Sequence, residues 1–264
     1  MGYFQSNKEA WEEAFSKRLN GWGDSNAERL KAEKTPFLDA KLVRELQDIG
    51  LEGKRVAQFC CNNGRELLSM MHLGPASGTG FDIAENIILQ ARETAEKAGT
   101  PNCEFIACNL LDIPETNTAS FDLVLFTIGA VTWFYDLKPL FDKVALCLRP
   151  GGTLLIEDDH PFVGMIPLPG EPAFDEAHLN QLTYPYFRDY PWIENEGIGY
   201  ISGNYPSKTF TSFSHTMADI INQAIASGFR IQKLVEFDES VGVAQAYDKK
   251  GLPLSYLLRA DKKA

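Results

Sequence analysis

Several features of membrane, secreted and metal-binding proteins are missing from this sequence of 264 residues. It has no run of about 18 apolar residues, so it predicts no transmembrane helix. Residues 1–18 lack the basic start and apolar stretch of a signal peptide, which favours a cytoplasmic location. The five cysteines form no CxxC pair and no Cys/His ligand spacing, so we expect reduced thiols and no metal site.

Basic residues are also scarce. Lys and Arg together number 25 against 36 Asp and Glu, which gives a formal net charge of −11. Such a chain repels phosphate groups, and no run of Lys or Arg offsets this, so neither nucleic acid nor a membrane is expected as a partner. The sequence also lacks GxSxG, HExxH and P-loop motifs, which argues against three common classes of hydrolase.

Short apolar runs alternate with helical patterns in the first two thirds of the chain. Strands are predicted over 55–60, 79–83, 103–107, 121–127 and 153–157, with helices near 66–71, 85–98 and 137–148. This alternation predicts an α/β fold with a doubly wound, mostly parallel sheet and helices on both faces. After a helix over 215–227, two more runs (229–237 and 252–260) are expected to complete seven strands as an antiparallel pair at the sheet edge.

We expect a single domain with four parts. They are an N-terminal helical cap (1–49, with helices over 8–19 and 37–49), a cofactor-binding core (50–157), a lid-like insertion (158–210), and a final helix with closing strands (211–264). The insertion is rich in Pro, Gly and aromatic residues and weakly periodic, which is typical of a substrate lid. Its aromatic cluster, at positions 184–192, also fits a satellite core or a homodimer contact.

The turn after the first predicted strand is the first place to look for a ligand, because open α/β sheets bind ligands at the carboxyl ends of their strands. Residues 61–64 tolerate positive φ, and the next helix presents free N–H groups that attract an anion. Asp82 ends the second strand, where a carboxylate can accept hydrogen bonds from both ribose hydroxyls. Together these features predict a nucleoside ligand, the alternative being a tight turn and a helix cap.

A nicotinamide oxidoreductase is an alternative function, because such an enzyme would bind its cofactor at the same turn. A pyrophosphate usually requires glycines in the pattern GxGxxG, but Cys60, Asn62 and Arg65 stand at those positions. A ligand without a pyrophosphate suits the turn better.

Four segments carry a resemblance to a known family. Residues 56–64 (VAQFCCNNG), 80–86 (GFDIAEN), 105–114 (FIACNLLDIP) and 148–152 (LRPGG) resemble the motifs of class I methyltransferases that use S-adenosylmethionine (SAM). His160-Pro161 and residues 253–261 resemble a poorly characterised bacterial branch with small-molecule or unknown substrates. The resemblance covers residues 50–160 best.

The resemblance implies methyl transfer from SAM to a small-molecule acceptor, with S-adenosylhomocysteine (SAH) as product. It also implies that SAM is bound by Phe59, Cys60, Asn62, Gly64, Asp82, Ile83, Asn109, Leu110 and Thr127. Gln58 and Asn109 stand where the family usually has carboxylates, so their hydrogen bonds would lack charge assistance. The alternative is therefore a non-catalytic protein that binds SAM or another nucleoside on the same fold.

Candidate catalytic residues follow the fifth predicted strand. Asp158 and His160 lie at its carboxyl end, and a neutral imidazole could act as a general base. A turn with a helix cap is the alternative interpretation of this segment, and His215 is expected to be structural. Trp133 and Phe134 are candidate walls of the substrate pocket, and Tyr3, Phe4 and Trp11 could close over the cofactor or simply pack.

Overall fold

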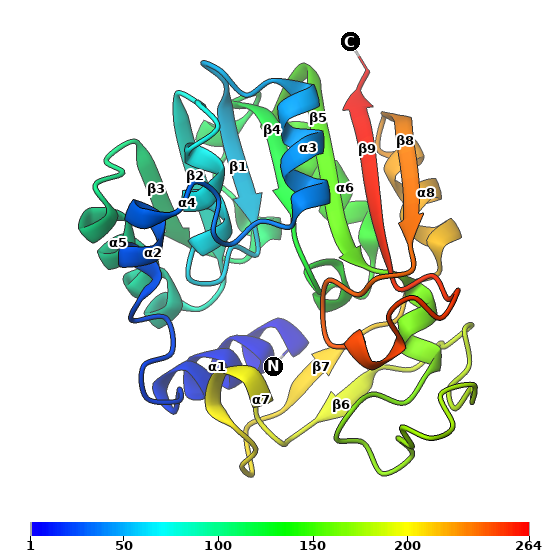
Figure 1. Ribbon diagram of the computed structural model, residues 1–264. Coiled ribbons are helices and arrows are strands. Elements are labelled where there is room, and N and C mark those ends of the chain that lie inside the picture. Colours follow the sequence, from blue (N-terminus) through cyan, green and yellow to red (C-terminus); the bar gives the residue numbers. More distant parts are fainter. Residues whose placement is uncertain (1, 264) are drawn as a thin grey trace.

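Seven strands form the central sheet of the computed structural model, which describes residues 2–263 (Figure 1). Their order is β3-β2-β1-β4-β5-β9-β8. The first five in the chain are parallel: β1 (Arg55–Phe59), β2 (Ser77–Asp82), β3 (Cys103–Ala107), β4 (Phe121–Phe126) and β5 (Leu148–Asp159). β8 (Phe229–Phe237) and β9 (Ser255–Lys262) then complete the sheet.

Helices cover both faces of this sheet, as apolar side chains on alternate positions of buried strands require. In β4, Leu123 and Leu125 face the cluster with α2 (Asn26–Ala32), α3 (Ala40–Ile49), α4 (Arg65–Met71) and α5 (Glu85–Ala98). Val124 and Phe126 face the opposite cluster, which contains α6 (Leu137–Cys147) and α8 (Met217–Ala226). The sheet is therefore the middle of three layers.

The predicted fold is confirmed, with one refinement at the sheet edge. The antiparallel strand is β9, which pairs with β5 on one side and with β8 on the other. The edge strand β8 therefore runs parallel to β5. β5 is also longer than the predicted strand over 153–157, because the segment before it pairs with the start of β4 across a register shift.

A layer of N-terminal and inserted segments covers the carboxyl ends of the parallel strands (Figure 1). It contains α1 (Tyr3–Ser16), a two-stranded sheet of β6 (Trp192–Glu194) and β7 (Phe210–Ser212), and α7 (Gly199–Ser202). Asn7 joins α1 to β7, since its side chain donates to the Thr211 carbonyl at 2.8 Å and accepts from the Thr211 N–H at 2.7 Å. Within residues 1–49, α1 thus covers the strand ends, whereas α3 packs on a face of the sheet.

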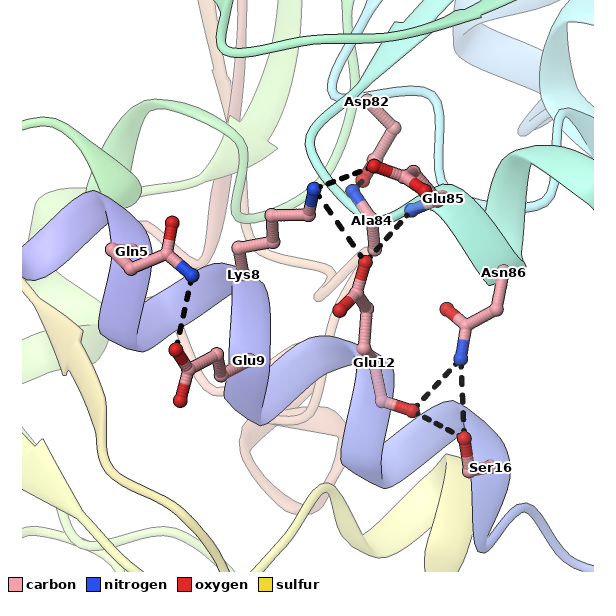
Figure 2. Close-up of polar contacts among 9 residues, drawn as sticks. All are labelled: Gln5, Lys8, Glu9, Glu12, Ser16, Asp82, Ala84, Glu85 and Asn86. Atoms are coloured by element: carbon pink, nitrogen blue, oxygen red, sulfur yellow. Dashed lines mark hydrogen bonds and ion pairs between the residues drawn. The ribbon is translucent and has the colours of Figure 1, made fainter.

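Polar contacts also fix α1 to the start of α5, close to Asp82 (Figure 2). Lys8 forms an ion pair of 2.8 Å with Glu85, and the Glu85 N–H donates to the Glu12 carboxylate at 3.2 Å. The Asn86 side chain donates to the Glu12 carbonyl at 2.8 Å. The helix predicted over 8–19 is α1, which lies earlier in the chain. It connects the central sheet with the inserted segment, because it contacts both α5 and β7.

The connections contain short 3-10 helices at Leu110–Asp112, Glu115–Asn117, Val131–Trp133, Pro161–Met165 and Gln245–Tyr247. Among residues 2–263, no helix combines the length and apolar character that crossing a membrane demands.

Candidate cofactor and substrate site

A cavity of about 570 Å³, here called the large chamber, lies at the carboxyl ends of the central strands. Seven of the predicted cofactor-binding residues line it: Cys60, Asn62, Asp82, Ile83, Asn109, Leu110 and Thr127. Because they follow four neighbouring strands, the topology brings them together from four distant stretches of the sequence. α1 contributes Phe4, Asn7 and Trp11 to the opposite wall.

The turn between β1 and α4 has a left-handed backbone at three alternating positions. The φ angles are 55° at Cys60, 49° at Asn62 and 74° at Gly64. The methyltransferase family that residues 56–64 resemble usually has a GxGxG turn with its three glycines at these positions, and here only Gly64 is a glycine. The turn therefore keeps the left-handed conformation that glycine favours although two of its three residues carry side chains, at a cost of about 1–2 kcal/mol for an ordinary residue.

Asp82 holds this turn in place. One carboxylate oxygen accepts from the Asn62 N–H at 2.9 Å, and the other accepts from the Ala84 N–H at 3.1 Å, beside the start of α5. Burial raises the pKa of the Asp82 carboxyl above its ordinary value of 3.8. Each oxygen keeps a second lone pair, so the residue can support the turn and still accept hydrogen bonds from a ligand in the large chamber.

Phe59 and Gly64 do not line the large chamber, contrary to their predicted role as cofactor contacts. The β1 pleat directs the Phe59 ring into the core, with its centroid 5.4 Å from that of Phe81 and 5.6 Å from that of Phe126. A Cβ atom on Gly64 would lie 2.3 Å from the Phe105 ring. Phe59 therefore packs in the core, and Gly64 is the position of the turn at which a side chain would overlap the Phe105 ring.

Two amides stand where the resemblance implies carboxylates. Asn109 lines the large chamber, and its side-chain oxygen accepts from the Leu111 N–H at 3.1 Å. The amide nitrogen of Asn109 takes no part in this hydrogen bond. Gln58 is buried beneath the chamber and donates to the Thr127 hydroxyl at 2.8 Å. The Gln58 oxygen is also buried, and no hydrogen-bond partner for it exists among residues 2–263.

A second cavity of about 250 Å³, the small chamber, adjoins the large one. Five residues line both chambers: Gly129, Thr132, Asp159, Glu194 and Ser212. Its other polar residues include both predicted catalytic candidates, Asp158 and His160. The predicted lid segment contributes Tyr184 and Trp192, whereas Phe187 is 83% exposed on the surface.

Asp158 is 2% exposed and lies at the end of β5. One carboxylate oxygen accepts from the backbone N–H groups of Gly129 and Asp159. The other oxygen, Oδ2, is buried and has no hydrogen-bond partner within the described chain. Burial and the neighbouring Asp159 carboxylate raise the pKa of Asp158 to about 8, so its carboxyl can exchange a proton near neutral pH.

His160 is poorly placed to act as the base that the sequence suggests. Its Nδ1 accepts from the Phe162 N–H at 3.0 Å, and its Nε2 lies 2.9 Å from a Glu236 oxygen. Both ring nitrogens are therefore engaged, and the residue caps the 3-10 helix at Pro161–Met165. The geometry does not support a proton-transfer role for His160.

His215 lines the small chamber and was expected to be structural. Its Nε2 lies 2.8 Å from the Phe134 carbonyl oxygen, which can only accept, so in the neutral ring Nδ1 is the basic nitrogen. Burial lowers the pKa of this imidazole below 6.5. Nothing in the sequence near position 215 distinguishes it, because its place depends on how α8 packs against α6.

Other residues of the large chamber come from the helix after the turn (Glu66) and from the predicted lid (Glu194, Ile198 and Tyr200). No sequence pattern connects the segments of Trp22 and of the loop residues Val241, Gly242 and Val243 with a site. Within residues 2–263, no group of three His, Cys, Asp or Glu side chains could hold a metal ion.

Comparison with known proteins shows which families the chain is similar to. Residues 56–152 match the family described as "Methyltransferase domain". The chain is 23% identical to a demethylmenaquinone methyltransferase of Lactococcus lactis over 193 residues, 71% of this chain and 75% of the relative. A tRNA U34 carboxymethyltransferase of Campylobacter concisus is 29% identical over 41% of this chain and 37% of its own length.

Solved structures share the fold at lower identity. The geranyl diphosphate C-methyltransferase of Streptomyces coelicolor, solved with Mg²⁺, geranyl diphosphate and SAH, superposes with a TM-score of 0.61 at 13% identity. The match covers 99% of this chain and 98% of that one, so the covering layer over the strand ends falls within the aligned length.

Proposed function

We propose that this chain is a class I SAM-dependent methyltransferase that methylates a small-molecule acceptor. Residues 56–152 match the methyltransferase-domain family, and solved SAM-dependent methyltransferases share the fold. The observation that carries the proposal is the pair of adjoining chambers, one lined by the residues expected for SAM and the other by polar and aromatic groups. A cofactor in the large chamber would lie next to an acceptor in the small one, because the two chambers adjoin and share lining residues.

The residues present fit SAM. Asp82 would accept hydrogen bonds from the ribose hydroxyls, and Asn109 and Leu110 would border the adenine. The unpartnered oxygen of Gln58 sits beside Thr127, where it could accept a hydrogen bond from an amino group or a water molecule. When bound, SAM supplies a methyl group on a positively charged sulfur, so the acceptor atom bonds to the methyl carbon as the carbon–sulfur bond breaks.

The protein's own contribution is to orient the acceptor and to exclude water. α1, β6, β7 and α7 cover the strand ends, and the small chamber reaches only about 250 Å³. This space and the net charge of −11 favour a small acceptor over the tRNA on which some relatives act.

Calorimetry with SAM and SAH tests the proposal directly. We expect binding of both at micromolar to millimolar concentration, and transfer of a labelled methyl group to at least one compound in a broad metabolite panel. Absence of SAH binding at millimolar concentration would overturn the proposal. Binding without transfer to any compound in the panel would favour the alternative of a non-catalytic SAM-binding protein.

Asn7→Ala should speed the release of SAH. Asn7 is buried, lines the large chamber, and makes both hydrogen bonds that hold α1 to Thr211. Losing two such bonds weakens the cover by about 1–3 kcal/mol, so we expect the SAH dissociation rate in stopped flow to rise roughly tenfold. Gln5→Ala, on the exposed side of the same helix, serves as the control and should leave the rate unchanged. Equal rates in wild type and Asn7→Ala would show that α1 does not retain the ligand.

A further inference from the structure

The small chamber is lined by acidic side chains without basic ones, as far as the described residues show. Four carboxylates line it, from Asp158, Asp159, Glu171 and Glu194, while no Lys or Arg does so within the described chain. Arg188 lies nearby but stacks on the Trp192 ring, 3.5 Å from its centroid, and is not part of the chamber wall. The two histidines of the wall do not compensate, because burial lowers the pKa of both His160 and His215.

Two of these carboxylates have a buried oxygen without a hydrogen-bond partner. Oδ2 of Asp158 and Oδ1 of Asp159 make no hydrogen bond to any residue between 2 and 263, and both side chains line the chamber. A buried carboxylate normally has a cation or hydrogen-bond donors around it, since leaving it unpaired costs several kcal/mol. The raised pKa of Asp158 has the same physical origin, namely a desolvated acid beside a second acid. The geometry therefore calls for a donor or a cation in the chamber.

SAM in the large chamber does not account for this requirement. Asp159 and Glu194 border both chambers, but Asp158 and Glu171 line only the small one. Because neither Asp158 nor Glu171 lines the large chamber, these two carboxylates need a partner of their own.

Aromatic and aliphatic side chains form the rest of the chamber. The rings of Tyr184 and Trp192 meet edge to face, with centroids 4.9 Å apart, and the Tyr184 hydroxyl donates to Glu171 at 2.8 Å. Phe213, Val163 and Ile166 add apolar surface. Aromatic rings next to carboxylates attract organic ammonium groups through both charge and cation–π contacts.

We propose that the small chamber is the acceptor site and that it takes a primary or secondary amine on an apolar or aromatic body. This inference rests on the proposed methyltransferase function. Asp158, with its unpartnered oxygen, binds the amino group, while Trp192, Tyr184 and Phe213 pack against the apolar body.

The chemistry of methyl transfer supports an amine over other acceptors. A bound ammonium has no lone pair, so it first passes a proton to Oδ2 of Asp158, which leaves a neutral amine and a neutral carboxyl. When the nitrogen bonds to the methyl carbon, the positive charge of the sulfur passes to the nitrogen, where Asp159 and Glu194 stabilise it. A carboxylate or phosphate acceptor would instead be repelled by the acids that are ionised at neutral pH, such as Asp159 with its pKa of about 6.

Binding of matched small molecules to the SAH-loaded protein tests this inference. The probes are 2-phenylethylamine, 2-phenylethanol and phenylacetate, which share a phenylethyl-type body and differ in charge. By calorimetry we expect the amine to bind at least tenfold more tightly than the alcohol, and phenylacetate to bind weakest. Asp158→Asn, similar in shape to the protonated acid, should reduce amine affinity at least tenfold and leave alcohol and SAH affinity within twofold.

Two further variants keep the test decisive. Asp189→Asn removes an exposed carboxylate from the same segment and should change none of the affinities. Glu171→Gln removes another carboxylate of the small chamber, and it tests the amine assignment if Asp158→Asn fails to fold. Failure of SAH to bind would overturn the proposed function itself. SAH binding together with equal or tighter binding of the alcohol or phenylacetate would overturn only the amine assignment.

Discussion

Asp82→Asn should weaken SAH binding about 10- to 150-fold. The carboxylate lines the large chamber and already accepts two backbone N–H groups, so it is fixed in position before a ligand binds. Hydrogen bonds to a charged acceptor are worth about 1.5–3 kcal/mol, and 1.4 kcal/mol corresponds to a factor of ten in affinity. An amide also presents its NH₂ to one of the two backbone N–H donors, so the turn loses a bond as well. Calorimetric titration with SAH measures the loss.

Glu85→Gln is the matched control for this substitution. Glu85 is three residues further along, its side chain is 68% exposed, and it pairs with Lys8 on the surface (Figure 2). Because exposed ion pairs contribute about 0–1 kcal/mol, SAH affinity should stay within a few-fold of wild type. Unchanged SAH affinity in Asp82→Asn would show that the ribose is held by other residues, and the assignment of the large chamber to SAM would fail.

The central strands of the sheet could be predicted because they are buried on both faces. β4, for instance, is buried at every residue from Phe121 to Phe126, and such runs are visible in the sequence as apolar segments between helical patterns. β6 and β7 were not predicted. Each has three residues, and of these six only Phe210 is buried. The two strands pair across a segment of 15 residues, so neither periodicity nor turn chemistry marks them.

The part of the candidate site that follows from strand ends could be predicted residue by residue. Cys60, Asp82 and Thr127 lie together because parallel strands end at the same edge of the sheet. Residues that reach the chambers from α1, from the inserted segment and from the loop near Gly242 depend on tertiary packing, which local patterns do not encode. Phe59 was misassigned because the sequence shows that it ends a strand but not which face of the sheet its ring takes.

The conformation of the turn leads to the prediction with the largest effect on stability. Gly64→Ala should lower the free energy of unfolding by about 2–5 kcal/mol. A left-handed backbone costs an alanine about 1–2 kcal/mol, and its Cβ would overlap the Phe105 ring, where overpacking typically costs about 1–3 kcal/mol. Phe105 is buried in the core and cannot move aside freely. Urea denaturation followed by circular dichroism measures the difference.

The other two left-handed positions should accept glycine with little change in stability. Cys60→Gly and Asn62→Gly remove the left-handed penalty, and the gain is offset by the entropy that glycine loses on folding, about 0.5–1 kcal/mol, so each should lie within about 1 kcal/mol of wild type. Both variants should bind SAH, because they leave the backbone of the turn in place. A large loss of stability in Cys60→Gly together with a harmless Gly64→Ala would mean that side-chain packing, not backbone conformation, determines which residues this turn accepts.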